Sequence, residues 1–358
     1  MRSSFRLFRI LGISVEVHIT FLLFFLLLLL AGAANSLFFV IIFSVVLAHE
    51  LCHSVAAILS GIPVPRILLL PFGGLASIEV PEKPMTELKV SLAGPLFNFF
   101  LSAVCVFLIL VSGFDLIGYG RLLDLLYAGG VEVFTPSYVL SLLATSNFIL
   151  GVFNMLPAFP MDGGRVLRSV LALWVDYVRA TEIAGRVGQL IFAFLIVAGL
   201  LTFNIWWIVV GFFLIYASGG EVRFTQLRRA FNGLLMRDMV YSQMMLPVVQ
   251  SSMAVGDFFS LVARPSQRFY LVVDGVGSLK GILDLHDLEG VGVQTTKVGS
   301  FSKGGYGVVD GCVRVMDVLK NVLSNAVTLV VDNGSVIGYV TPEFLMEAAM
   351  FRRLSHRA

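Results

Sequence analysis

A short segment near residue 50 contains the residue types that bind a metal ion and activate water. It reads His49-Glu50-Leu51-Cys52-His53, an H-E-x-x-H pattern. Residues i and i+4 share one face of a helix, so the two imidazoles can bind one zinc ion while Glu50 reaches a water molecule beside it. The whole chain has only 5 His, which makes a chance match rare. We therefore predict His49 and His53 as zinc ligands and Glu50 as the catalytic base.

The setting of this pattern supports the prediction, because it lies in an apolar run of about residues 36–60. An ionisable side chain inside a membrane span costs about 3 kcal/mol on insertion scales and normally has a function. The alternative is that these polar residues lie at a helix-packing seam. We interpret Cys52 as a small apolar side chain and not as a third ligand, since free cysteine behaves as a buried hydrophobic residue.

A catalytic zinc ion needs a third protein ligand, and Asp162 is the candidate. It lies in residues 154–164, which read NMLPAFPMDGG. Two prolines interrupt the helix and two glycines allow close backbone approach, so Asp162 is expected on a non-helical turn at membrane depth. The alternative is an ordinary N-capping Asp for a helix over residues 164–177. The presence of both motifs in one chain favours the ligand.

The composition places most of the chain in a membrane. Hydrophobic residues make up 58% of the chain and charged residues only 13%, with 31 Phe. Soluble domains carry about 25% charged residues, so this chain has too little polar surface to cover a globule. A formal net charge of +2 excludes nucleic acid as a partner, and 3 Cys do not make a disulfide scaffold.

Apolar runs long enough to cross a membrane, which takes about 20 helical residues, fill the first part of the chain. We expect six spans, at about residues 15–34, 36–60, 88–112, 137–156, 183–202 and 205–219. The first run is too long for the apolar part of a signal peptide, so we expect it to be a permanent helix. The predicted fold is a polytopic α-helical membrane protein with six transmembrane helices.

The basic residues that flank these runs predict the orientation of the chain in the cell membrane. With the N-terminus inside, the inner segments hold nearly all Lys and Arg of the spanning region, whereas the outer loops hold only Arg121. Positive charge is enriched on the cytoplasmic side. An even number of spans then returns the C-terminus to the cytoplasm, so we expect a multi-pass protein with both termini cytoplasmic.

Taken together, the two metal motifs resemble those of the site-2 protease family of intramembrane zinc metalloproteases. The resemblance extends to residues 12–18 before the first span, to Phe72-Gly73-Gly74 after the second, and to Gly94-Pro95-Leu96-Phe97-Asn98 in the third. It covers about residues 5–220. It implies that His49, His53 and Asp162 bind zinc, one ion per chain, and that Glu50 is the catalytic base.

The same resemblance implies a short sheet at the membrane edge, formed by residues 66–80. An exposed strand edge there can bind an unwound substrate by strand addition. We expect Asn98 and Asn154 to hold the substrate backbone or the oxyanion, because both side chains are uncharged hydrogen-bond donors. We expect His18 to have a packing or accessory role and not to bind the metal.

The remainder of the chain is richer in charge and contains a weak internal repeat. Val272-Val273-Asp274 and Val330-Val331-Asp332 each precede a turn, an apolar strand and a glycine. The two units resemble a tandem pair of CBS motifs in a cytoplasmic α/β module, which implies nucleotide contacts at Asp287 and Thr341. The signature is incomplete, since Asp284 replaces its usual Thr or Ser and Phe344 stands where an Asp is expected. A structural or dimerising module without ligand is therefore the alternative to an adenine-nucleotide sensor.

The predicted domains are a metalloprotease domain over residues 1–220, a linker over 221–235, and CBS units over 236–292 and 293–350. The leading hypothesis is a zinc metalloprotease that cuts a membrane protein substrate in or near a transmembrane segment, modulated by the CBS module. Its expected partners are that substrate, the lipid bilayer, adenine nucleotide, and a second copy bound through the CBS module. The alternative is a catalytically inactive membrane adaptor or transporter that senses a ligand through the CBS pair.

Overall fold

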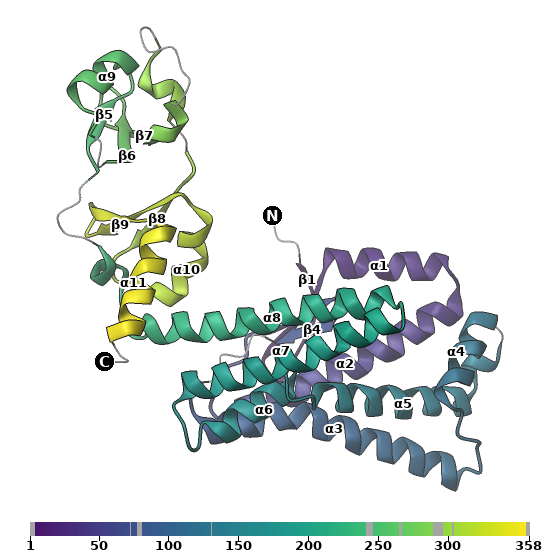
Figure 1. The fold of residues 1–358 in the computed structure, drawn as a ribbon. Helices are drawn as coiled ribbons and strands as arrows, with labels where there is room; N and C mark the ends of the chain where they lie inside the picture. The colour runs from purple at the N-terminus through teal and green to yellow at the C-terminus, as the bar shows by residue number, and fades with distance from the viewer. Residues whose placement is uncertain are drawn as a thin grey trace. The chain divides into compact units, whose positions relative to one another are not determined.

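The chain forms two compact units, which divide between Thr225 and Gln226. The structure is a computed structural model that describes residues 4–71, 73–76, 81–129, 131–240, 246–264, 267–288, 296–302 and 304–355. Among the described residues, the first unit has one sheet and the second unit has two (Figure 1). Each unit also has its own hydrophobic cores.

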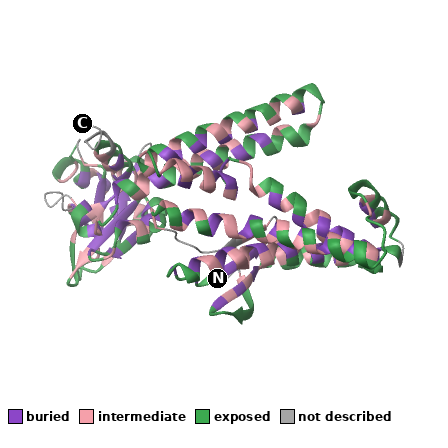
Figure 2. Ribbon diagram, turned by 90° about the horizontal axis from the view of Figure 1, so that it is seen from below, coloured by how far each residue is buried: buried purple, intermediate pink, exposed green. Residues whose placement is uncertain are grey.

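The first unit contains helices that are long and apolar enough to cross a membrane. Among the described residues these are α2 (Ala33–Leu59), α3 (Pro84–Val111), α5 (Pro136–Asn154), α7 (Tyr177–Leu201) and α8 (Ile205–Ala230). Many of their large apolar side chains are exposed, such as Phe107 at 63% and Phe194 at 75%. Figure 2 shows exposed residues along the outer faces of these helices. Contiguous exposed apolar faces of this kind are typical of surfaces that contact lipid.

These five helices match five of the six predicted spans, but the count of six is not confirmed. Helix α1 (Ile19–Leu30) has only 12 residues. At a rise of 1.5 Å per residue it is about 18 Å long, shorter than a hydrocarbon core of about 30 Å. Residues 13–18, which the prediction placed largely within the first span, form strand β2 (Ile13–His18) instead. Its apolar residues alternate with Ser14, Glu16 and His18, a period of two that predicts a half-buried strand.

A four-stranded sheet lies beside helix α2 in this unit. Its order is β1-β2-β3-β4, where β1 spans Ser4–Ile10, β3 Arg66–Leu70 and β4 Gly73–Ala76. Strands β2 and β3 are parallel, and the other pairs are antiparallel. The apolar side of the sheet packs on Ala57 of α2 and Val90 of α3. Phe72 and residues 77–80, which belong to the predicted sheet segment, lie outside the described residues.

Helix α3 contacts three helices of the first unit, α2, α5 and α6, and runs alongside α5 (Figure 1). Against α5, the Ser102 hydroxyl donates a 2.8 Å hydrogen bond to the Ala144 carbonyl. A Cβ at Gly151 would lie 3.0 Å from the Phe99 ring. Small and hydroxyl-bearing residues at such contacts let membrane helices approach closely. The position of α3 therefore fixes the helices on either side of it.

The described part of the first unit also contains two further short helices, α4 (Tyr119–Ala128) and α6 (Asp162–Leu171).

The second unit contains two similar three-stranded sheets. The first has the order β5-β6-β7 and the second β10-β9-β8. In each sheet a parallel pair is followed by an antiparallel pair, and Val272 pairs with Gly281 as Val330 pairs with Gly338. The bounds are β5 Val248–Gln250, α9 Val255–Leu261, β6 Phe269–Val273 and β7 Leu279–Asp284, then β8 Tyr306–Asp310, α10 Val315–Ser324, β9 Val327–Asp332, β10 Ser335–Val340 and α11 Pro342–Ser355. The internal repeat in the sequence thus corresponds to a repeated topology.

The packing of the second unit differs from the predicted boundaries in two places. Residues 221–230, predicted as part of a linker, continue helix α8. Met236 and Met239, assigned to the first CBS unit, pack in one core with Val315 and Leu345 of the second sheet's helices. Residues 289–295, which contain the predicted boundary between the two CBS units, lie outside the described residues.

This packing predicts a large effect of truncating Met236, whose side chain is fully buried. Met236→Ala leaves a cavity in the second core, so we expect the free energy of unfolding of fragment 226–358 to fall by about 2–5 kcal/mol. Chemical denaturation of the fragment measures this change. Met346→Ala, a matched change at a side chain that is 50% exposed, should alter the free energy by no more than about 0.5 kcal/mol. Equal effects of the two substitutions would contradict this assignment of Met236.

Candidate metal centre

Helix α2 places His49 and His53 one turn apart on the same buried face, opposite α3. Both side chains are nearly inaccessible, with exposed fractions of 4% and 6%. At the point of contact α3 has Gly94, where a Cβ would lie 2.4 Å from His53 Nε2 and 2.6 Å from His49 Cε1. Real side chains do not approach so closely, so only glycine leaves room for the two rings at this position.

The orientation of the His53 ring is set by the backbone of α3. Its Nδ1 lies 2.7 Å from the Val90 carbonyl oxygen. A carbonyl only accepts hydrogen bonds, so the hydrogen-bond network assigns the proton to Nδ1 and leaves a lone pair on Nε2 of the neutral ring. This is the usual arrangement of a metal-binding histidine, whose second nitrogen donates to a carbonyl or a carboxylate.

Asp162 is the first residue of α6, directly after the turn that follows α5, and so does not lie on the non-helical turn that the sequence predicted. Helix α5 ends at Asn154 and α6 begins at Asp162. The intervening turn folds tightly onto α6, since a Cβ at Gly163 would lie 2.2 Å from the Leu156 carbonyl oxygen and one at Gly164 would lie 2.6 Å from the Ala158 carbonyl carbon. The N-cap of α6 is Met161. Asp162 therefore does not occupy the N-cap position that the alternative interpretation required.

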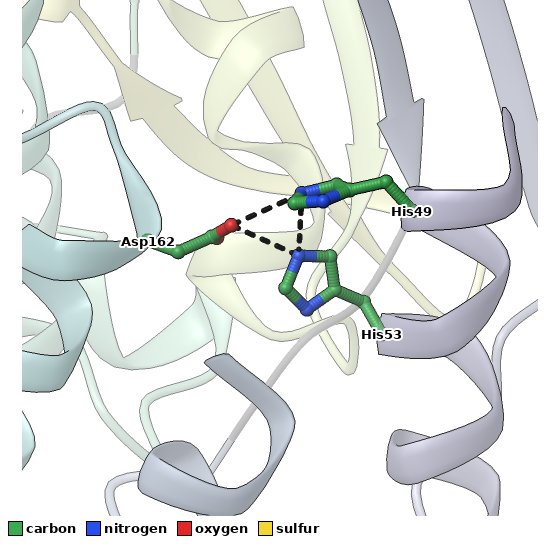
Figure 3. A group of neighbouring side chains, drawn as sticks. All are labelled: His49, His53 and Asp162. Carbon is green, nitrogen blue, oxygen red and sulfur yellow. Dashed lines mark hydrogen bonds and ion pairs between the residues drawn. The ribbon is translucent and has the colours of Figure 1, made fainter. Parts of the chain in front are cut away.

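Three donor atoms from the two motifs converge on one point (Figure 3). Asp162 Oδ2 lies 3.2 Å from His49 Nε2 and 3.0 Å from His53 Nε2, and the two imidazole nitrogens are 3.0 Å apart. These residues form the group of potential metal ligands found among the described residues. Cys52 is not part of it, and His18 instead accepts a hydrogen bond from the Thr20 amide at the start of α1.

This geometry fits a zinc ion. Because His53 Nε2 has no proton in the neutral ring, a single proton on His49 can serve only one of the three contacts, whereas a cation serves all three. Atoms that bind zinc tetrahedrally at 2.0–2.1 Å lie about 3.3 Å from one another, close to the observed separations. Two histidine nitrogens and one carboxylate oxygen are also the donors of many catalytic zinc sites, which keep a fourth position open.

Glu50 lies outside this group of three but close to it. It follows His49 directly in helix α2. A Cβ at Gly74 would lie 2.7 Å from Glu50 Cγ, so the Glu50 side chain packs against strand β4. Glu50 is therefore next to one of the potential metal ligands in sequence and in contact with the sheet.

The two asparagines predicted to contact substrate differ in their surroundings. Asn98 lies on α3 one turn beyond Gly94, is completely buried, and neither polar atom of its amide has a hydrogen-bond partner within the described part of the chain. Asn154 donates a 3.1 Å hydrogen bond to the Leu150 carbonyl at the end of α5. Asn98 thus retains its full hydrogen-bonding capacity, whereas part of the capacity of Asn154 is used within its helix.

The residues predicted to contact nucleotide lie in the second unit. Asp287 is half-buried in a 3-10 turn (Leu285–Leu288) that follows β7. The Thr341 hydroxyl accepts a 3.2 Å hydrogen bond from the Phe344 amide at the start of α11, so it acts as a helix cap. Asp284 forms an ion pair with Arg268 at 2.9 Å. Partial burial alone would raise the pKa of Asp284, but hydrogen bonds from Arg268 and His286 outweigh it and hold this pKa below its usual value.

Some contacts of the centre were not predicted from the sequence. The Val90 carbonyl could not be predicted from residue type, because every residue offers the same backbone acceptor. Gly94 belongs to the Gly94-Pro95-Leu96-Phe97-Asn98 motif that the sequence analysis identified. The motif did not predict that Gly94 packs directly against the two histidine rings. Arg168, whose buried ion pairs lie near Asp162, carried no recognisable motif.

Comparisons with known proteins find relatives among zinc metalloproteases. Residues 37–198 match the model of peptidase family M50. A zinc metalloprotease of Methanocaldococcus jannaschii is 34% identical over 303 residues, which cover 81% of each chain. The solved structure of a site-2 protease from Methanocaldococcus jannaschii matches with 35% identity and a TM-score of 0.44, covering 61% of this chain and 95% of that one. A CBS domain of a bacterial CNNM/CorC family Mg²⁺ transporter, solved with ATP, matches with 17% identity and a TM-score of 0.31, covering 36% of this chain and 97% of that one.

Substitution of Gly94 tests the close contact on which the centre depends. Gly94→Ala places a methyl group within 2.4 Å of His53 Nε2, so the rings must move and the three donor atoms separate. We expect zinc affinity to fall by at least about 10-fold, as for other changes that disturb the orientation of metal ligands. Competition with a chelator measures it. Gly120→Ala on α4, where a Cβ meets nothing within 4 Å, is the matched control. Normal zinc affinity in Gly94→Ala would refute the packing argument.

Proposed function

Because the chain belongs to peptidase family M50, we propose that it hydrolyses a peptide bond in or near a transmembrane segment of a membrane protein, close to the cytoplasmic face. The chain is a membrane protein and a zinc metalloendopeptidase, as its relatives and its long apolar helices indicate. The observation that carries the proposal is the convergence of His49, His53 and Asp162 within the helical bundle.

In the proposed site these three residues hold the zinc ion. Bound zinc supplies Lewis-acid chemistry to a water molecule and to the scissile carbonyl. The Asp162 carboxylate offsets part of the metal charge, and the Val90 carbonyl keeps the Nε2 lone pair of His53 directed toward the other ligands. Apolar helices around the site limit its contact with bulk water, which strengthens every charge interaction inside it.

Glu50 is the proposed proton carrier. It accepts a proton as water attacks the carbonyl carbon and then delivers this proton to the leaving amine nitrogen, so the carboxylate is regenerated in each turnover. The position of Glu50 beside the three ligands supports this role, since a general base must reach the attacking water. Asn98 is the proposed donor to the substrate backbone or the oxyanion, because its buried amide has no other partner within the described residues.

Strand β4 is the proposed binding edge for the substrate. It is the last strand in the sheet order β1-β2-β3-β4, and it lies against Glu50 through Gly74. A transmembrane helix hides its carbonyl groups in internal hydrogen bonds, so a substrate must unwind locally before attack. Pairing of the unwound segment with β4 replaces the lost hydrogen bonds and places the backbone next to the proposed base.

The second unit is proposed to be a CBS module that modulates proteolysis. The repeated topology of its two sheets supports the tandem arrangement. Asp287 is the proposed contact for a nucleotide ribose, with Thr341 as a weaker candidate because its hydroxyl already caps α11. A structural or dimerising module without ligand remains the alternative. For the chain as a whole, an inactive adaptor or transporter is disfavoured, because the three ligands and Glu50 are all in place.

Replacing Glu50 tests the proposed chemistry. Glu50→Gln keeps the size of the side chain but cannot accept a proton, so we expect at least about a 100-fold loss of proteolysis with zinc still bound. The assay is fragment formation from single-span membrane proteins co-expressed with the protease, together with metal analysis of the purified protein. Asp162→Ala should instead lose zinc as well as activity. Glu132→Gln, at an exposed carboxylate, should change neither. Near-normal turnover in Glu50→Gln would exclude the role of the base.

Reporter fusions test the proposed orientation. Reporters before Met1 and after Ala358 should both be cytoplasmic, and one inserted at Tyr127, which is 86% exposed in α4, should lie outside. The N-terminal reporter is decisive for α1, because an external N-terminus would show that this 12-residue helix does not cross the membrane. A cytoplasmic Tyr127 reporter would reverse the proposed orientation and move the site to the other leaflet.

Calorimetry on fragment 226–358 tests the proposed nucleotide site. We expect ATP, ADP or AMP to bind the unmutated fragment, and Asp287→Ala to abolish this binding, because a ribose hydroxyl then loses its acceptor. Asp317→Ala on α10 is the matched control at an exposed carboxylate in an ion pair with Arg314. Absence of binding at millimolar nucleotide would leave only the structural or dimerising role.

A further inference from the structure

A buried arginine connects α6, the helix that begins with Asp162, to three other helices. Arg168 lies on α6, and only 5% of it is exposed. Its Nε donates a 2.9 Å hydrogen bond to Glu87 Oε1, and its Nη2 contacts the same oxygen. Its Nη1 donates to Glu221 Oε1 at 3.2 Å and to Thr225 at 3.5 Å. One guanidinium therefore joins α6 to α3 and to α8.

Two aromatic rings complete the surroundings of Arg168. The guanidinium carbon lies 4.9 Å from the centre of the Phe159 ring and 5.0 Å from that of Tyr177, distances typical of cation–π contacts. Phe159 lies in the turn just before Asp162, and its side chain is fully buried. The Tyr177 hydroxyl of α7 donates a 3.0 Å hydrogen bond to Glu87 Oε2. Arg168 thus contacts the turn before Asp162 while it anchors the helix after it.

Helix α3 connects this arginine to the histidine side of the metal centre. Glu87, which binds Arg168, lies one turn before Val90, whose carbonyl orients the His53 ring. The same turn of α3 therefore positions His53 on one side and α6, with Asp162 at its first residue, on the other. The 3.0 Å separation of His53 Nε2 and Asp162 Oδ2 depends on both connections.

We propose that Arg168 is a positioning residue that holds Asp162 in register with His49 and His53 through Glu87, Glu221 and Phe159. This inference rests on the proposed zinc site but adds a residue that contacts neither metal nor substrate. Lysine cannot replace it, because the contacts use three different nitrogens of a planar guanidinium and lysine offers a single point charge.

The experiment uses the full-length protein loaded with Co²⁺, whose visible spectrum reports the geometry of the metal ligands, and measures zinc affinity by chelator competition. Arg168→Lys keeps the positive charge but loses the three donor nitrogens of the planar guanidinium. We therefore expect a changed cobalt spectrum and about 10-fold weaker zinc binding. Glu221→Gln removes one partner whose side chain is 30% exposed, and should change both readouts less, in the same direction. Arg179→Gln, at an exposed arginine on α7, should change neither.

A purely structural role predicts a different pattern. The melting temperature of Arg168→Lys would then fall while the folded protein kept the wild-type cobalt spectrum and zinc affinity, and this result would overturn the inference. If Arg168→Lys does not fold, Glu221→Gln decides by the same two readouts. Failure of the wild-type protein to bind zinc would instead refute the proposed zinc site, so the two failures are distinguishable.

Discussion

The first unit is organised around the mutual repulsion of three electron-rich atoms. His49 Nε2, His53 Nε2 and Asp162 Oδ2 lie 3.0–3.2 Å apart among buried residues. In a medium of low dielectric constant, a carboxylate held against a lone pair is costly unless a positive charge lies between them. A zinc ion held at the proposed site would supply this charge. Helix packing must therefore hold the three proposed ligands at these distances.

Helix α3 meets this requirement. It has no side chain at Gly94, where the histidines need space, and it offers a carbonyl at Val90, where His53 needs an acceptor. One turn earlier, Glu87 binds the arginine of the helix that begins with Asp162. Both the two histidines and Asp162 are thus positioned by contacts with α3. The position of α3 is itself fixed by close packing on α5. Substitutions along this part of α3 are expected to affect the metal even though none of its residues is a proposed ligand.

The sequence predicted the proposed ligands but not all of the contacts that position them. His49, Glu50 and His53 were recognisable because helical spacing alone puts the histidines on one face, and Asp162 because prolines and glycines marked its turn. Strand β2 was wrongly included in the first span, since the leucines that follow it dominated the local hydrophobicity. The contacts of Val90 and Arg168 depend on which helices meet in space, and no local pattern encodes that. The capping role of Thr341 likewise depends on where α11 begins.

X-ray absorption at the zinc edge of the purified protein tests the central claim most directly. We predict one zinc ion with nitrogen and oxygen ligands at about 2.0–2.1 Å, including the imidazole scattering of two histidines, and no sulfur ligand. A sulfur shell at about 2.3 Å would show that Cys52 or another cysteine binds the metal. That result, or a protein that retains no zinc, would contradict a centre built from His49, His53 and Asp162.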